Sequence, residues 1–474
     1  MREARQFYID GRWTDPDAAV EFDVINPATE QKAGTIHIGS AIDVDRAVAA
    51  ASRAFPSFAK TSRAERLELF DNIIEEYRKR RPELAEAITA EMGAPKTLAD
   101  KLHGFMGHVH LRTAQTVLKT YEFEEMRKGT RVMLEPIGVC GLITPWNWPV
   151  NQIAAKVAPA LACGCTVVLK PSEMSPFSAQ IWAEVMHAAG VPAGVFNMVY
   201  GTGLGVGRAI SAHRDIAMIS FTGSTLAGID VARTAAATIK RVHQELGGKS
   251  ANIIMPDADF ENAVRQGLKT LMNNSGQSCN APTRMLVPHD RMAQAHDLLA
   301  DAANAVTVGD PLGDPDIGPV ISRIQYDKIQ TLIGQGIDEG GKLAAGGLGR
   351  PDGLDAGYFI RPTVFTHVTN DMAIAREEIF GPVLCVIGYD DLDEAVAIAN
   401  DSDFGLAAYI QGKDPVAIAK MVQDLRVGQI NVNNANPDAM APFGGYKHSG
   451  NGREWGDHAF EAFLEIKAVL TAAN

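Results

Sequence analysis

From about residue 137 to its C-terminal end, the chain alternates short apolar runs with longer amphipathic stretches. The apolar runs have the length of buried strands and read VCGLIT, TVVLK, FNMVY, AMISFTG, ANIIM, TRMLVP and VLCVIGY. Stretches with the 3.6-residue period of helices lie at residues 62–80, 151–162, 175–189, 260–273, 291–305, 323–338 and 391–400. The Gly-rich residues 340–358 interrupt the alternation and are predicted to form a loop in contact with solvent. Because the alternation is typical of βαβ units, we expect an α/β protein with largely parallel sheets.

The segments outside this alternation predict additional structure at both ends of the chain. Ser40 followed by Asp43 has the pattern of a helix N-cap, which predicts a helical N-terminal segment before the sheet. Residues 120–136 are predicted to form a β-hairpin that turns near Lys128–Gly129, and residues 462–470 a lone terminal strand. Both need sheet partners that a second subunit could supply, so we expect the chain to associate.

The composition narrows the kind of partner. A chain of 474 residues has room for two or three domains. Its net charge of −13, without a basic cluster, argues against nucleic acid and anionic membranes, so we expect a small-molecule partner. The N-terminal sequence MREARQFYIDGRW lacks an apolar signal core, and no apolar run approaches the ~18 residues of a membrane span. These features predict a cytoplasmic protein.

One of the five cysteines differs from the others in its surroundings. Cys279 lies in NNSGQSCNAP, among polar and turn-forming residues, whereas apolar runs hold the other four, which are Cys140, Cys163, Cys165 and Cys385. So few cysteines predict reduced thiols and no disulfide framework. The CGC sequence has no second Cys/His pair nearby, so we expect no metal site. Cys279 is a candidate reactive thiol, although its position alone does not decide the question.

Two loops after predicted strands are candidates for binding a phosphate. YGTGLGVG lacks the dinucleotide fingerprint, because Val206, Arg208 and Ile210 stand where its last Gly or Ala is needed, so it is either a tight turn or part of a cofactor site. Residues 222–225 lie between a strand and a predicted helix. Their backbone N–H groups and hydroxyls either hold a phosphate or simply cap the helix.

The segment TVVLKPSE places Lys170 and Glu173 just after the end of a strand. An acidic side chain there can accept hydrogen bonds from both ribose hydroxyls of an adenosine, and its charge disfavours a 2′-phosphate. A solvated pair of surface charges is the alternative for both residues.

The motifs PWNWP, LKPSE, FTGST, ELGGKS, GQSC, EEIFGPVL and PFGGYKHSGNGRE together resemble the aldehyde dehydrogenase superfamily, in order and spacing over nearly the whole chain. The resemblance implies an aldehyde dehydrogenase-like α/β fold. It places a Rossmann-type NAD-binding domain at 1–117 and 137–246, an α/β catalytic domain at 247–448, and a β oligomerisation element at 118–136 and 459–474. It also implies NAD as cofactor, with weaker use of NADP, and a homodimer or homotetramer.

The resemblance also assigns the catalytic roles. Cys279 is implied as the nucleophile toward the aldehyde carbonyl, and the Asn147 side-chain amide with the Cys279 backbone N–H as the donors to the oxyanion. After hydride leaves for the nicotinamide, a thioester remains on the protein. Glu245 is implied as the general base that activates water to hydrolyse it.

Further residues are implied in the cofactor and substrate sites. The expected NAD contacts are Thr144, Pro145, Trp146, Lys170, Ser172, Glu173, Gly203, Phe221, Gly223, Ser224, Leu246, Glu378 and Phe380. The expected substrate pocket comprises Trp148, Asn151, Gln152, Ala155, Ser278, Asn280 and Phe443, with Pro437 near its entrance. This set holds no Arg or Lys, and relatives often carry large aromatic residues at the positions of Ala155 and Pro437. We therefore predict a wide apolar tunnel that favours hydrophobic or aromatic aldehydes over acetaldehyde and acidic semialdehydes.

Five charged residues also match charged positions of the family, and they are Lys156, Arg241, Arg453, Glu454 and Glu465. Arg241, Arg453 and Glu465 are predicted to form an ion network at a subunit interface. Glu454 is predicted to support the general base as a second base.

Alternatives remain at single residues and for the whole chain. His243 is either a proton relay or a packed strand histidine, and Ser278 with Asn280 leaves no second cysteine for a vicinal disulfide. The thioester could pass to coenzyme A, although acylating relatives generally lack the carboxylate of Glu245. A cofactor-free cysteine hydrolase and a non-catalytic protein are further alternatives, and neither explains why the cofactor positions are all filled.

Overall fold

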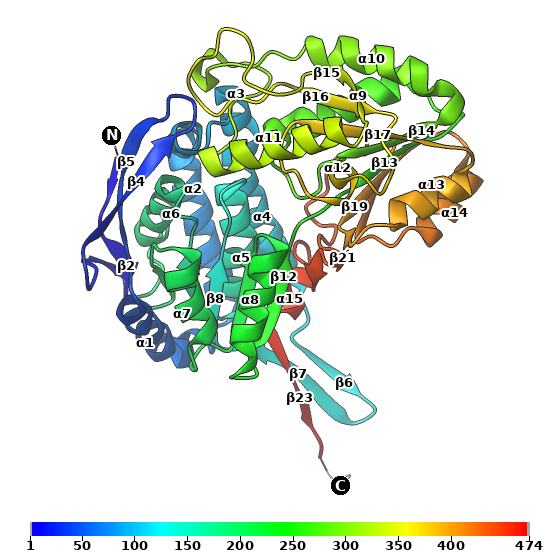
Figure 1. Cartoon of the computed structure of the whole chain (residues 1–474). Coiled ribbons are helices and arrows are strands. Elements are labelled where there is room, and N and C mark those ends of the chain that lie inside the picture. Colours follow the sequence, from blue (N-terminus) through cyan, green and yellow to red (C-terminus); the bar gives the residue numbers. More distant parts are fainter. Residues whose placement is uncertain (1, 472–474) are drawn as a thin grey trace.

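The structure is a computed structural model that describes residues 2–471, and it contains two α/β lobes, each built around one sheet (Figure 1). The first sheet has eight strands in the order β22-β12-β11-β8-β9-β10-β2-β3. These strands are β2 Phe7–Ile9, β3 Arg12–Thr14, β8 Val139–Ile143, β9 Thr166–Lys170, β10 Phe196–Met198, β11 Met218–Thr222, β12 Arg241–Glu245 and β22 Gly450–Asn451. The five strands from β12 to β10 are parallel, so the predicted α/β class is confirmed.

Helices cover both faces of this sheet. They are α1 Ala41–Phe58, α2 Arg63–Met92, α4 Gly104–Thr120, α5 Pro149–Cys163, α6 Pro176–Ala188, α7 Arg208–Ala212 and α8 Thr225–Ala236. Every residue of α5 is buried, since α2, α4 and α6 pack against it. Pro149 in its first turn and left-handed Gly164 at its C-cap set its two ends. Helix α4 was not predicted, because the Gly and His residues of GFMGHVHLRT obscure the 3.6-residue repeat of its apolar residues.

The second sheet has seven strands in the order β15-β16-β17-β14-β13-β19-β20, all parallel to their neighbours except β15. They are β13 Ala251–Ile254, β14 Arg284–Pro288, β15 Lys342–Ala345, β16 Thr363–Thr366, β17 Val383–Tyr389, β19 Ala407–Gln411 and β20 Gln429–Val432. Its helices are α9 Phe260–Met272, α10 Met292–Asn304, α11 Arg323–Asp338, α13 Leu392–Asn400 and α14 Pro415–Asp424. The shorter elements are α3 Lys96–Leu98, α12 Ala373–Arg376, α15 His458–Glu461, β18 Phe404–Gly405 and β21 Tyr446–Lys447.

One sequence prediction about a loop was wrong, and one about the N-terminal segment was right only in part. Strand β15 lies inside the stretch 340–358 that was predicted to be a loop, because its backbone pairs with β16 although its own sequence, KLAA, has no strand pattern. The predicted helix after Ser40 is present as α1, but it does not precede the whole sheet, because strands come before it. Strands β2 and β3 extend the first sheet, and β1 Arg2–Ala4, β4 Val20–Asn26 and β5 Gln31–Ile38 form a separate small sheet. The predicted cap is confirmed, since Ser40 and Asp43 form a capping box at α1.

The predicted hairpin is confirmed as β6 Glu124–Arg127 and β7 Thr130–Pro136, with left-handed Lys128 and Gly129 between them. The terminal strand β23 Leu464–Val469 is not alone, because it pairs with β7 in an antiparallel register. The resulting three-stranded sheet extends away from the two lobes (Figure 1). Its outer strands expose Met126 by 65% and Ile466 by 74%, and no residue from 2 to 471 pairs with their outer edges. Association through these edges stays a prediction, and residues 472–474 of the predicted element lie outside the described residues.

The parallel strands of the first sheet end at one edge. Thr222 pairs with Glu245 at the ends of β11 and β12, and Ile143 pairs with Lys170 at the ends of β8 and β9. Ligands of open α/β sheets bind at the carboxyl ends of the strands, so this edge is where a site is expected. Among residues 2–471, no helix is both long and apolar enough to cross a membrane.

Candidate active site

The cysteine loop connects α9 to β14 and takes an unusual backbone path. Asn274, Ser275 and Gly276 all have positive φ angles of 55°, 56° and 74°. A Cβ on Gly276 would lie 2.1 Å from the carbonyl oxygen of Gly381, so only glycine fits there. The loop leaves Cys279 partly accessible, whereas the other four cysteines are buried, which confirms the predicted contrast between them.

The Cys279 thiol is protonated in this resting arrangement. Burial raises its pKa, and the negative charges of Glu378 and Glu245 raise it further. The backbone N–H groups of Cys279 and Asn280 act in the opposite direction, because they favour the thiolate. The thiol therefore needs a base to become a nucleophile.

Asn147 lies between β8 and α5 and is held against the cysteine loop. Its side-chain nitrogen donates to the carbonyl oxygen of Gln277 over 3.0 Å, and Asn274 donates to the Asn147 carbonyl oxygen over 2.9 Å. A carboxamide has two N–H donors, so one fixes the orientation and the second is left for a ligand.

Glu245 ends strand β12 and is 2% exposed. Among residues 2–471, neither of its carboxylate oxygens has a hydrogen-bond partner. Burial raises its pKa well above the usual range, and the charge of Glu454 raises it further. A buried carboxylate with a raised pKa is suited to accept a proton near neutral pH.

Three residues surround the base. Glu454 forms a buried ion pair with Lys156, whose ammonium also donates to the Ser220 hydroxyl over 3.2 Å. Burial opposes ionisation of Glu454, but Lys156 outweighs it and lowers the pKa of Glu454. His243 Nε2 lies 3.6 Å from Glu245 Oε1, and burial lowers the pKa of His243 to about 4. His243 is therefore neutral beside the base.

The predicted ion network is only partly present within the chain. Arg241 pairs with Glu465 over 2.9 Å and also donates to two carbonyl oxygens near β23. Arg453 is not part of this pair, because its guanidinium donates to the carbonyl oxygens of Gly445 and Gly452.

The strand edge provides a set of groups that fits a dinucleotide. Lys170 and Glu173 lie 2.9 Å apart after β9, and Ser224 caps α8, where it accepts from the Ala227 N–H. A side chain added at Gly203 would meet nothing within 4 Å, so this backbone is open to a ligand. The predicted turn after β10 is one π-helical turn, Gly203–Gly207, that begins at this glycine.

Two buried hydroxyls at the same edge, those of Thr144 and Thr222, have no hydrogen-bond partner among residues 2–471. Such groups call for a ligand or water. Pro145, Ser172, Phe221, Gly223 and Leu246 lie in the same strand-end segments. Nothing in the arrangement is incompatible with a bound dinucleotide.

The second lobe contributes Glu378 and Phe380 to the opposite side. The Glu378 carboxylate accepts from the Gly248 N–H over 2.9 Å, and a Cβ on Gly247 would lie 2.6 Å from it. The ring of Phe380 packs edge-to-face against Trp146 with centroids 5.4 Å apart. These contacts bring together residues that are 130 or more positions apart in the sequence.

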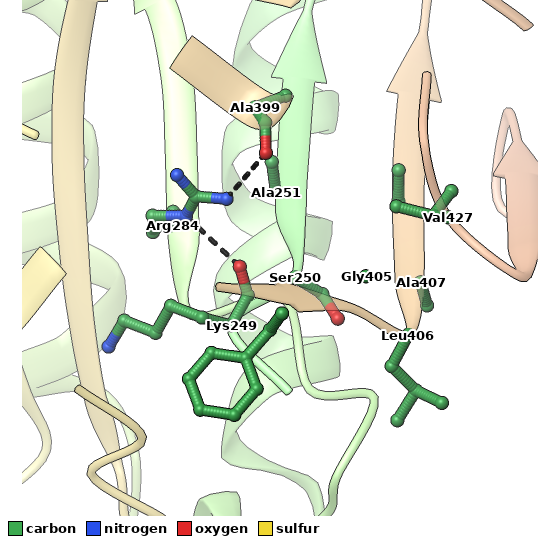
Figure 2. A pocket seen from close by; sticks show the side chains of 11 residues that line it. Lys249, Ser250, Ala251, Arg284, Ala399, Gly405, Leu406, Ala407 and Val427 are labelled. Carbon is green, nitrogen blue, oxygen red and sulfur yellow. Dashed lines mark hydrogen bonds between the residues drawn. The ribbon is translucent and has the colours of Figure 1, made fainter. Parts of the chain in front are cut away.

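A buried arginine anchors the chain where it enters this lobe. Figure 2 shows Arg284 on β14 donating to the carbonyl oxygens of Lys249, over 3.0 Å, and Ala399, over 2.9 Å. The cavity beside it has a volume of about 10 Å³, room for roughly one water molecule and none for a substrate. The arrangement therefore fixes the segment that follows Glu245 and does not form a second active site.

The predicted pocket residues of α5 share one helix face. Trp148, Asn151, Gln152 and Ala155 follow the spacing i, i+3, i+4, i+7. The Trp148 indole donates to the Ser278 hydroxyl over 2.9 Å, which joins this face to the cysteine loop. Across the site, Phe443 stacks on Trp455 at 4.7 Å.

Sequence reasoning missed four residues that hold the site together, which are Asn274, His103, His110 and Trp455. His103 stacks on Trp148 at 4.0 Å and lies 3.2 Å from Asn274 Oδ1. The turn-forming letters NNSG around Asn274 were a usable signal for a left-handed backbone. The histidines lie in a π-helical turn, Ala99–His103, and in α4, and no sequence pattern marks them.

Within residues 2–471, no cluster of His, Cys, Asp and Glu side chains has the arrangement of a metal site. A thiol, an oriented carboxamide and a buried carboxylate beside a nucleotide-binding sheet edge define an oxidoreductase that acts on aldehydes. The sequence profile described as "Aldehyde dehydrogenase family" matches residues 13–469, and the chain belongs to this family.

Characterised relatives and solved structures align over almost the full chain. A 3-succinoylsemialdehyde-pyridine dehydrogenase of a Pseudomonas species is 54% identical over 99% of both chains. A cysteine-to-alanine variant of aldehyde dehydrogenase C from Pseudomonas syringae, in complex with NAD+ and octanal, is 52% identical with a TM-score of 0.98, covering 99% of this chain and 98% of that one. A Mycobacterium tuberculosis aldehyde dehydrogenase complexed with NAD+ is 39% identical with a TM-score of 0.96, covering 99% and 98%.

Proposed function

We propose that the chain is an NAD-dependent, non-acylating aldehyde dehydrogenase that prefers hydrophobic or aromatic aldehydes. The observation that carries this proposal is the buried carboxylate of Glu245, which has no hydrogen-bond partner among the described residues. Its negative charge contributes to the raised pKa of the Cys279 thiol. A base in this position serves hydrolysis of an acyl group on Cys279 by water. A dehydrogenase that delivers the acyl group to coenzyme A has no use for it.

Different residues of the chain act in the successive steps of the proposed reaction. Cys279 loses its proton to solvent through water, and the thiolate attacks the aldehyde carbon. The free N–H of Asn147 and the Cys279 backbone N–H stabilise the oxyanion of the hemithioacetal. A nicotinamide held by the residues of the strand edge would supply the acceptor for the hydride that leaves this carbon. Glu245 then takes a proton from water as the water attacks the Cys279 thioester, and the acid and the free thiol are released.

The first lobe is proposed as the NAD-binding domain and the second as the catalytic domain. Lys170 and Glu173 would hold the adenosine ribose, the α8 N-terminus at Ser224 the pyrophosphate, and Glu378 the nicotinamide ribose. The Glu173 carboxylate would repel a 2′-phosphate, while Lys170 offsets part of this repulsion. NAD is therefore the expected cofactor, with weaker use of NADP.

The proposed substrate class rests on the pocket and on two relatives. The predicted pocket residues carry no cationic side chain that could pair with a second carboxylate. Octanal is bound by the Pseudomonas syringae relative, and the other Pseudomonas relative is named for a pyridine-bearing semialdehyde. Both compounds are larger than acetaldehyde, and octanal is also less polar. We also propose that the exposed edges of β6 and β23 join subunits into a homodimer or homotetramer.

One assay tests the proposal. NADH formation at 340 nm is measured with hexanal or benzaldehyde, with and without coenzyme A. We expect NADH without coenzyme A and no stimulation by it. A requirement for coenzyme A would replace hydrolysis with acyl transfer, and ester hydrolysis without any NADH would point to a cysteine hydrolase.

A further inference from the structure

Helix α5 presents two carboxamides on the face that otherwise carries Trp148 and Ala155. Asn151 is 9% exposed and Gln152 is 7% exposed, so both amides are nearly removed from solvent. Polar groups in such places are normally hydrogen-bonded, because an unpaired one loses its water without compensation. The partners of these two amides therefore indicate what the face is built to bind.

The Asn151 amide is held in one orientation by a histidine. His110 lies on α4, alongside α5 (Figure 1), and its Nε2 is 2.7 Å from Asn151 Oδ1. The His110 ring is 3% exposed and lies 5.2 Å from the Trp455 ring, which stacks on Phe443. Burial lowers the pKa of His110, so the neutral ring donates its Nε2–H to the Asn151 oxygen.

This contact leaves the donors of Asn151 available. With its oxygen occupied by His110, its NH2 group points the other way, and no acceptor among residues 2–471 takes a hydrogen bond from it. The neighbouring Gln152 adds a second unsatisfied atom, since its buried Oε1 has no partner among the described residues. The helix face thus offers the uncharged N–H donors of Asn151. Beside them lies the Gln152 carbonyl oxygen, an acceptor without a partner among the described residues.

We propose that Asn151 determines substrate specificity by donating a hydrogen bond to a neutral acceptor on the aldehyde, a ketone oxygen. This proposal rests on the proposed function above and narrows its substrate class. A hydrocarbon chain in the same place leaves the donors unpaired, and a carboxylate finds no cation there. An aromatic ketone aldehyde satisfies the donors and still buries its ring against Trp148 or Phe443.

A matched pair of substrates tests this role. 4-Oxo-4-phenylbutanal and 4-phenylbutanal have the same carbon skeleton and differ only in a carbonyl group in place of a methylene. For the unaltered enzyme with NAD, we expect a higher kcat/KM for the ketone. In Asn151→Leu, which keeps the side-chain shape, the ratio of the two kcat/KM values should fall by about tenfold, the usual effect of one neutral hydrogen bond left unmade.

A second variant keeps the test valid if Asn151→Leu does not fold. His110→Phe keeps the ring beside Trp455 and removes the donor that orients Asn151, so the same ratio should fall, though by less. His108→Phe, the same substitution on α4 at a histidine whose ring lies beside that of Phe105, is the control and should leave the ratio near that of the unaltered enzyme. An unchanged ratio in Asn151→Leu, or in His110→Phe if the first variant does not fold, overturns the proposal. No NADH from the unaltered enzyme with either aldehyde would instead overturn the proposed function.

Discussion

The side-chain nitrogen of Asn147 and the carbonyl oxygen of Gln277 are joined by a hydrogen bond of 3.0 Å, two residues before Cys279. This bond connects the start of α5 in one lobe to the cysteine loop of the other. Asn274 reinforces it by donating to the Asn147 carbonyl oxygen, so the amide is oriented before a substrate arrives. An oriented donor needs no rearrangement when charge develops on the substrate oxygen.

Replacing Asn147 by Ala should lower kcat/KM by about 10²- to 10³-fold, as expected for the loss of one oxyanion donor. The rate of the first NADH turnover should fall by the same factor, because the donor acts before hydride transfer. The fold should survive, since Asn274 also reaches the Gln277 oxygen at 3.4 Å. A loss confined to KM would show that Asn147 binds substrate without stabilising the oxyanion.

Replacing Cys279 by Ala should abolish both aldehyde oxidation and any esterase side activity, because both pass through an acyl group on the same sulfur. Cys163→Ala serves as the matched control, since Cys163 is buried and its thiol contacts the Phe460 carbonyl oxygen, far in sequence from the cysteine loop. It should keep its activity per molecule. Dehydrogenase activity that survives in Cys279→Ala would falsify the covalent mechanism.

Glu245→Gln separates the two halves of the reaction. If Glu245 serves mainly the hydrolytic water, NADH should still form in a burst of one equivalent or less, while turnover falls by about 10²- to 10⁴-fold. The acylated enzyme should then accumulate and be visible by mass spectrometry. If the burst disappears with the turnover, Glu245 is also needed to deprotonate Cys279, whose pKa is raised by burial.

The pH at which Glu245 ionises depends on neighbouring charges of both signs, among them Glu454 and Lys156. Burial raises its pKa most, Glu454 raises it further, and Lys156 lowers it. Only ionised Glu245 can accept a proton from water, so hydrolysis is lost as the pH falls below this raised pKa. Glu454→Gln should therefore move the acidic limb of the kcat profile to lower pH, and Lys156→Met should move it to higher pH.

These opposite shifts distinguish an electrostatic effect from damage to the fold. Each variant breaks a buried ion pair, which typically costs about 3–5 kcal/mol, so thermal unfolding is measured beside each pH profile. Loss of stability alone would lower activity at every pH in both variants. Shifts in the same direction would mean that the two charges do not act on Glu245.

The parallel-sheet core could be predicted from sequence because its strands are buried on both faces. β9 and β17, for example, are continuous apolar runs, and their predicted bounds agree with the structure. Strand β15 and the N-terminal strands were not predictable, since short edge strands depend on a partner elsewhere in the chain. The pairing of β23 with β7 joins segments more than 300 residues apart, which no local pattern reveals.

The candidate site was likewise predicted only in part from the sequence. Family motifs located the thiol, the carboxamide and the carboxylate, because such motifs are local stretches of sequence. The residues that orient these groups could not be predicted from the sequence, since His103 and His110 contact the site only after α4 has packed against α5. Within the chain Arg453 donates to carbonyl oxygens of its own loop, and its role in an ion network between subunits stays a prediction.

The last prediction concerns the order of substrates. Trp148 and Phe443 offer flat apolar surfaces, each stacked on a second ring, and Ala155 is a small side chain at a predicted pocket position. Each buried methylene contributes about 0.8 kcal/mol, so an aldehyde several carbons longer than acetaldehyde should gain well over tenfold in kcat/KM. NADH formation is compared across acetaldehyde, hexanal, benzaldehyde, a terpenoid enal and succinic semialdehyde, at matched enzyme concentration. Hexanal, benzaldehyde and the enal should exceed the other two. If acetaldehyde or succinic semialdehyde gave the highest kcat/KM, the wide and uncharged tunnel would have to be abandoned.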